Sequence, residues 1–130
     1  MDLKFGLIGS IAVYIGNEEL EITDRTTPES FVIQKYLAKM VEEKVDIVIL
    51  EVSSQAMVLD RVTGCKFDAC LFTNLTEDHI SPKEHKDMED YFNAKFSLMK
   101  IAPFIVTTPD NEYTARIPKL LPNTPTKTFS

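Results

Sequence analysis

Residues 45–54 read VDIVILEVSS and give the clearest indication of fold class. The stretch opens with a continuous apolar run broken only by Asp46. Such a run is typical of a strand that is buried on both faces of a parallel sheet. The run ends at Glu51, and Ser53 or Ser54 can cap a short helix directly after it. A buried strand that leads straight into a helix indicates an α/β protein.

The flanking segments alternate between strand-like and helix-like patterns. Upstream, a β-rich run over 3–15, a turn at Gly16-Asn17 and a second run over 20–23 resemble a hairpin. Thr26-Thr27-Pro28-Glu29 has the composition of a helix start, and apolar residues recur at helical spacing over 31–41. Downstream we expect a strand at 67–72, a polar loop at 73–86, a helix at 87–100, a strand at 104–107, a helix at 112–121 and a last strand at 126–129.

These patterns predict an α/β fold with a partial, mostly parallel sheet flanked by helices. Residues 1–130 are expected to form a single incomplete domain, because the chain opens directly in a strand and stops in another.

Composition narrows the possible functions. The chain has 130 residues, a net charge of −6 and no Lys/Arg-rich run, so we expect no nucleic-acid partner. No apolar run approaches membrane length, and the first ten residues do not resemble a signal peptide, so no membrane is expected. Cys65 and Cys70 fit neither a disulfide framework nor a zinc spacing, which indicates a reducing, cytoplasmic location.

Two predicted strands end in residues that can bind a metal. Ligands of open parallel sheets bind beyond the carboxyl ends of the strands. Glu51 ends one strand and His79 follows another, so adjacent strands would let the two side chains share a divalent cation. Each residue also has an ordinary interpretation, as a strand-end carboxylate and as a hydrogen-bonded loop histidine. His85 lies in the same polar loop and is expected in solvent.

Three further positions have both a structural and a functional interpretation. Thr26-Thr27 is explained by a helix cap, although a helix N-terminus can also hold a phosphate or carboxylate. Arg61, just past the short helix, has the pattern of a surface arginine. Lys95 lies on the apolar face of helix 87–100, where it either extends its ammonium to water or is partly buried with a lowered pKa. A lowered pKa would expose the neutral amine that reacts with carbon dioxide.

Five strings, in order and at close spacing, resemble the central domains of MurE-type Mur ligases. They are TTPE at 26–29, EVSSQA at 51–56, RV at 61–62, FTNLTEDH at 72–79, and MEDY with the following AK over 88–95. The resemblance covers nearly the whole chain and implies a Mur ligase central domain, whose fold is P-loop NTPase-like.

The resemblance also implies an activity. The family enzyme is a cytoplasmic, ATP- and magnesium-dependent ligase of peptidoglycan precursor synthesis, which adds the third amino acid to UDP-MurNAc-L-Ala-D-Glu. Its reaction begins with transfer of the ATP γ-phosphoryl group to the substrate carboxylate. The amine of the incoming amino acid then attacks the acyl phosphate.

The family's roles carry over position by position. Thr26 and Thr27 match the pair that holds UDP-MurNAc-dipeptide, and Ser53 and Arg61 match further contacts to that substrate. Glu51 and His79 match magnesium ligands. Lys95 matches a lysine that is carbamylated and helps to hold the second magnesium.

The chain contains no G-x-x-x-x-G-K-[ST] loop, which in this family comes just before the segment starting at Leu3. Without that loop we expect the chain alone to bind neither ATP nor Mg²⁺ and to be inactive. Two other interpretations stay open. The chain could belong to another Mur ligase or a folylpolyglutamate synthase relative, or it could be a non-catalytic binding or scaffold fragment.

Overall fold

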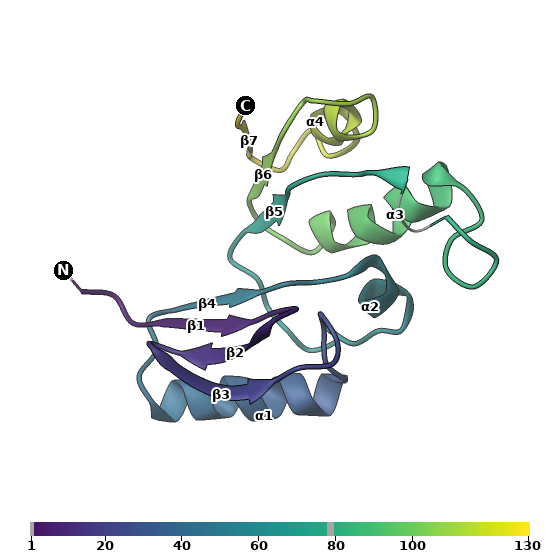
Figure 1. The fold of residues 1–130 in the computed structure, drawn as a ribbon. Helices are drawn as coiled ribbons and strands as arrows, with labels where there is room; N and C mark the ends of the chain where they lie inside the picture. The colour runs from purple at the N-terminus through teal and green to yellow at the C-terminus, as the bar shows by residue number, and fades with distance from the viewer. Residues whose placement is uncertain (1, 78–79) are drawn as a thin grey trace. The chain divides into compact units, whose positions relative to one another are not determined.

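The computed structural model describes residues 2–77 and 80–130 (Figure 1). The chain divides into two compact units, Met1–Thr63 and Gly64–Ser130, which we call the N-terminal and C-terminal units. Each is described by itself. No helix in the described parts of the chain is both long enough and apolar enough to cross a bilayer.

The N-terminal unit is a four-stranded sheet with a helix along one face (Figure 1). Its elements are β1 (Phe5–Ile8), β2 (Ala12–Ile15), β3 (Glu18–Ile22), α1 (Ser30–Glu42), β4 (Ile47–Leu50) and α2 (Ser54–Val58). The strand order is β3-β2-β1-β4, with β1 parallel to β4 and the other two pairings antiparallel. The predicted hairpin around Gly16-Asn17 is confirmed as β2 and β3, and Gly16 has the positive φ of 59° that such a turn favours.

The predicted β-rich run over 3–15 is broken in the structure. It forms two antiparallel strands, because residues 9–11 turn the chain and the Gly9 amide donates to the Ala12 carbonyl at 3.3 Å. This turn places Ser10 beside Glu51 at the carboxyl end of β4.

Helix α1 starts later than predicted. It begins at Ser30, and Glu29 occupies the N-cap position without a side-chain cap bond, so Thr26-Thr27 lies before the helix and does not cap it. The buried residues are Ile33, Tyr36 and Met40, while Phe31 and Val41, which are also among the apolar residues at helical spacing, are exposed. The helix approaches Gly6 so closely that a Cβ there would lie 2.7 Å from Met40 Sδ.

Strand β4 is less buried than its sequence predicts. Ile47, Val48 and Ile49 are exposed to between 38% and 52%, and β4 is the last strand of the four-stranded sheet, with β1 as its neighbour. The expectation that this strand is buried on both faces is therefore wrong for the described chain.

The C-terminal unit confirms the parallel prediction. Its elements are β5 (Cys70–Phe72), α3 (Met88–Met99), β6 (Ile105–Thr107), the 3₁₀ turn η2 (Thr114–Arg116), α4 (Ile117–Leu120) and β7 (Thr126–Thr128). The order is β5-β6-β7, and both pairings are parallel. Among the described strand pairings of the whole chain, three are parallel and two antiparallel, which agrees with a mostly parallel α/β fold.

Helix α3 packs its apolar face into the core of this unit. Asp87 caps its start by accepting the Asp90 amide at 2.8 Å. Phe92 is fully buried and contacts the rings of Phe72 and Phe96. The predicted helix at 112–121 is shorter in the structure and consists of η2 followed by α4.

Candidate functional site

Glu51, at the carboxyl end of β4, is held by the turn that joins β1 to β2. One of its oxygens, Oε2, accepts two hydrogen bonds from Ser10, from the hydroxyl at 2.6 Å and from the backbone amide at 3.0 Å. The Ser10 hydroxyl also lies 3.2 Å from Thr26 Oγ1. Because β1 and β4 are parallel and adjacent, the residues that follow both strands meet at one edge of the sheet.

Thr27 connects the segment before α1 to the end of β4. Its hydroxyl donates to the Glu51 carbonyl at 2.9 Å and accepts the Ser53 amide at 3.0 Å. The residue is only 1% exposed. Thr27 therefore fixes the backbone of 51–53 through a side chain that is already fully engaged.

Arg61 reaches the same segment from the end of α2. One guanidinium nitrogen donates to the Thr27 carbonyl at 3.1 Å, and the other lies 3.2 Å from Glu29 Oε1. The Arg61 side chain is only 12% exposed, so its surface interpretation is wrong. Its Nε atom is buried and has no hydrogen-bond partner among the described residues.

The Glu29 carboxylate partly balances the positive charges of Arg25 and Arg61 at this edge. Glu29 Oε1 also contacts Arg25 at 2.6 Å, so one carboxylate serves two guanidinium groups. Arg25 and Glu29 are both more than half exposed, and ion pairs between exposed side chains add little stability.

Ser53 is the N-cap of α2. Its Oγ accepts the Ala56 amide at 3.1 Å, and this confirms the expected cap at the start of the short helix. The hydroxyl proton of Ser53 is not used by that bond. The structure thus gathers Thr26, Thr27, Glu51, Ser53 and Arg61 at one edge of the N-terminal unit.

At this edge Glu51 offers one carboxylate oxygen that suits a hard cation such as Mg²⁺. Glu51 Oε1 accepts no hydrogen bond from the described residues, whereas Oε2 is fully used by Ser10. The described residues contain no group of three His, Cys, Asp or Glu side chains arranged for a metal. His79, the second expected magnesium ligand, lies outside the described residues.

Lys95, in the C-terminal unit, is partly buried on α3 as one of its two interpretations required. Its Nζ lies 5.0 Å from the centroid of the Tyr91 ring and 5.8 Å from that of Phe72. A long contact of 3.5 Å reaches the Asn74 carbonyl, just beyond β5. Burial lowers the pKa of the Lys95 ammonium, because the charged form loses water. The position therefore raises the fraction of neutral amine.

His85 is not in solvent, and that expectation is wrong. The residue is 2% exposed, and its ring stacks on Tyr91 with centroids 5.1 Å apart. Its Nδ1 lies 3.4 Å from Asp90 Oδ2. His85 packs against Tyr91 and Asp90 of α3, so the local polarity of the sequence did not predict its burial.

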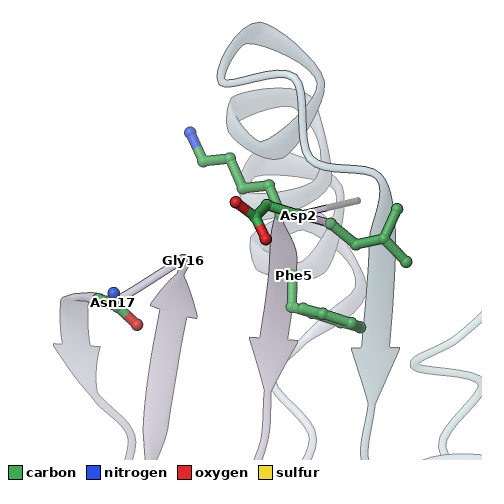
Figure 2. A pocket seen from close by; sticks show the side chains of 6 residues that line it. Asp2, Phe5, Gly16 and Asn17 are labelled. Atoms are coloured by element: carbon green, nitrogen blue, oxygen red, sulfur yellow. The ribbon is translucent and has the colours of Figure 1, made fainter.

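A shallow hollow of about 320 Å³ lies at the opposite edge of the N-terminal sheet (Figure 2). Asp2, Leu3, Lys4 and Phe5 line it at the amino end of β1, together with Gly16-Asn17 in the β2–β3 turn. Because ligands of parallel strands bind beyond the carboxyl ends, this hollow is not the candidate site.

Sequence reasoning missed Ser10. The residue lies inside a β-rich run, and its contact with Glu51 spans 41 positions of sequence. The available signal was the Gly9-Ser10 pair, a turn dipeptide within the run.

Comparisons with known proteins agree on one family. A family model described as the Mur ligase middle domain matches residues 1–130. The UDP-N-acetylmuramoyl-L-alanyl-D-glutamate--2,6-diaminopimelate ligase of Clostridium botulinum is 48% identical over 116 residues, which are 89% of this chain and 23% of that protein. The ligase of the same name from Bacillus cereus is 49% identical over 92 residues, 71% of this chain and 18% of that protein.

A solved structure of a ligase with that name shares the fold. It superposes with a TM-score of 0.82 at 22% identity, over 97% of this chain and 26% of the solved chain. The chain thus spans less than a quarter of the length of these two curated relatives.

Proposed function

The chain belongs to the Mur ligase middle-domain family, and on that premise we propose that it is part of a ligase that adds the third amino acid to UDP-MurNAc-L-Ala-D-Glu. The 48% identity to the Clostridium botulinum ligase over 89% of the chain carries this proposal. The edge formed around Glu51 supports it, since it brings together the residue types that such a substrate requires. Residues 1–130 would be one part of a single ATPase domain.

We assign substrate contacts to the N-terminal unit. Thr26, Ser53 and Arg61 face the carboxyl edge of the sheet, and a guanidinium suits a carboxylate or phosphate of the substrate. Thr27 has a different part in our proposal. Because its hydroxyl is engaged twice within the fold, it holds the 51–53 backbone in place and meets substrate, if at all, through its main chain.

We carry over the family's metal roles residue by residue, with Glu51 and His79 as magnesium ligands and Lys95, once carbamylated, as a residue that helps to hold the second magnesium. The neutral Lys95 amine attacks the carbon of CO₂, a nitrogen–carbon bond forms, and a proton leaves to solvent. The carbamate then offers oxygen ligands, which Mg²⁺ prefers. When bound, the metal neutralises charge on the transferring phosphoryl group. The residues of this chain would bind and orient the substrate and the metal, whereas the phosphate-binding loop would come from outside 1–130.

A chimaeric ligase tests the proposal. The matched 116-residue segment of the Clostridium botulinum ligase is replaced by the corresponding part of this chain, and ligation is assayed with UDP-MurNAc-L-Ala-D-Glu, ATP and diaminopimelate. We expect ATP-dependent product formation. A folded chimaera that binds ATP but forms no product would contradict the proposal and favour a non-catalytic fragment.

The isolated chain provides the matched control. It contains no Walker-type phosphate loop, so calorimetric titration with Mg-ATP should show no binding in the micromolar range. Micromolar binding by the chain alone would show that our assignment of the nucleotide site to another segment is wrong.

A further inference from the structure

The Glu51 carboxylate is bound asymmetrically. Both hydrogen bonds from Ser10 end on Oε2, at 2.6 Å from the hydroxyl and 3.0 Å from the amide. No described residue donates a hydrogen bond to Oε1. Two donors on one oxygen fix both the position and the rotation of the carboxylate plane.

Gly9 provides the space for this arrangement. A Cβ at position 9 would lie 2.7 Å from Glu51 Oε1 and 2.9 Å from its Cδ, closer than real side chains approach. Any other residue at position 9 would therefore displace the carboxylate from Ser10. The Gly9-Ser10 turn therefore fits closely around the Glu51 carboxylate.

The two hydrogen bonds from Ser10 are not needed to hold the end of β4 in place. Thr27 already fixes the Glu51 backbone from a fully buried position. Ser10 and Glu51 are both exposed, and hydrogen bonds between exposed groups add little to folding stability. The consequence of the two Ser10 bonds is therefore orientation of the carboxylate.

We propose that Ser10 is a positioning residue that leaves Glu51 with a single oxygen, Oε1, for a metal and thereby favours Mg²⁺ over Ca²⁺. Mg²⁺ requires octahedral geometry with short bonds and accepts one carboxylate oxygen, whereas Ca²⁺ takes six to eight ligands and readily binds both oxygens of a carboxylate. With Oε2 held by Ser10, the two-oxygen mode is closed. The inference rests on the proposed function, in which Glu51 is a metal ligand.

Metal competition in the chimaeric ligase tests this selection without measuring turnover. Bound Mn²⁺ is followed by electron paramagnetic resonance in the presence of a non-hydrolysable ATP analogue, and it is displaced with MgCl₂ or CaCl₂. For Ser10→Ala we expect the ratio of Ca²⁺ to Mg²⁺ affinity to rise about tenfold, within the range that such outer contacts contribute at metal sites. Ser10→Thr keeps the hydroxyl and should restore the original ratio. Ser30→Ala removes an exposed serine at the start of α1 and is the matched control.

The variants distinguish the selection of Mg²⁺ by Ser10 from the role of Glu51 as a metal ligand. If Glu51→Gln weakens Mn²⁺ binding but Ser10→Ala leaves the Ca²⁺ to Mg²⁺ ratio unchanged, the selection by Ser10 is refuted and the metal role of Glu51 stands. If Glu51→Gln has no effect on Mn²⁺ binding, both the selection and the assignment of Glu51 as a ligand fall.

Discussion

Replacing Thr27 by valine removes a hydroxyl with almost no change of shape. In the native chain that hydroxyl satisfies the Glu51 carbonyl at 2.9 Å and the Ser53 amide at 3.0 Å. Valine leaves both backbone groups facing an apolar methyl at a site only 1% exposed. An unsatisfied buried polar group costs about 1–3 kcal/mol, which gives about 2–6 kcal/mol for the pair. Because both hydrogen bonds are only partly buried, we expect a loss in the lower part of this range, about 2–4 kcal/mol. Such a loss is a large part of the ~5–15 kcal/mol that stabilises a typical domain.

Hydrogen exchange at the Ser53 amide measures this loss where it occurs. The exchange rate of that amide should rise in Thr27→Val, and urea unfolding monitored by circular dichroism should show a lower midpoint. Thr26→Val is the matched control, because Thr26 is half-buried and its hydroxyl has one side-chain neighbour, Ser10, at 3.2 Å. We expect that variant to stay within about 0.5 kcal/mol of the native chain. An unchanged Ser53 exchange rate in Thr27→Val would refute the reasoning.

Three other predictions concern packing and ionisation. Gly6→Ala places a Cβ 2.7 Å from Met40 Sδ and should destabilise the chain by about 1–3 kcal/mol. Met40→Ala alone also destabilises the chain because Met40 is buried, but the double variant lacks the clash, so its loss should be smaller than the sum of the two single losses. Additive losses in urea unfolding would contradict this packing. Burial raises the pKa of the Cys70 thiol to about 12, so a thiol reagent at pH 8 should modify Cys65 first and reach Cys70 only in denaturant; equal rates would show that Cys70 is accessible. Burial, followed by the hydrogen bond to Glu21, raises the pKa of Tyr36 to about 12. The contribution of the Tyr36 hydroxyl to the free energy of unfolding should therefore be complete below about pH 10, the pKa in the unfolded chain, and be lost as the pH rises toward 12. A difference in stability between the native chain and Tyr36→Phe that stays constant from about pH 9 to 12 would be inconsistent with this shift.

The sequence predicted the features that depend on local patterns. Helix α3 was expected over 87–100 and lies at Met88–Met99, because its apolar period and the Asp87 cap are both local signals. The parallel order of β5, β6 and β7 also agrees with the alternation of strands and helices. Partial burial of Lys95 was one of two interpretations, and the position of the residue on the apolar face of α3 made it possible.

The features that were not predicted depend on tertiary contacts that local sequence patterns do not signal. Thr27 has the composition of a helix cap, but its hydroxyl contacts residues 24 and 26 positions away, and α1 begins at Ser30. His85 lies in a polar loop, yet the ring stacks on Tyr91 and is buried. No periodicity of the chain signals such tertiary contacts.

We propose that this chain supplies metal-binding residues of a ligase and that Lys95 is the residue that is carbamylated. The most direct test is the ligation rate of the chimaeric enzyme carrying Lys95→Ala, measured in bicarbonate-free buffer with and without a small carboxylic acid such as acetate. We predict that the substitution removes most of the activity, because the carbamate oxygens are lost, and that the added acid partly restores it by occupying the vacated space. Near-normal activity of Lys95→Ala without any added acid would contradict the claim.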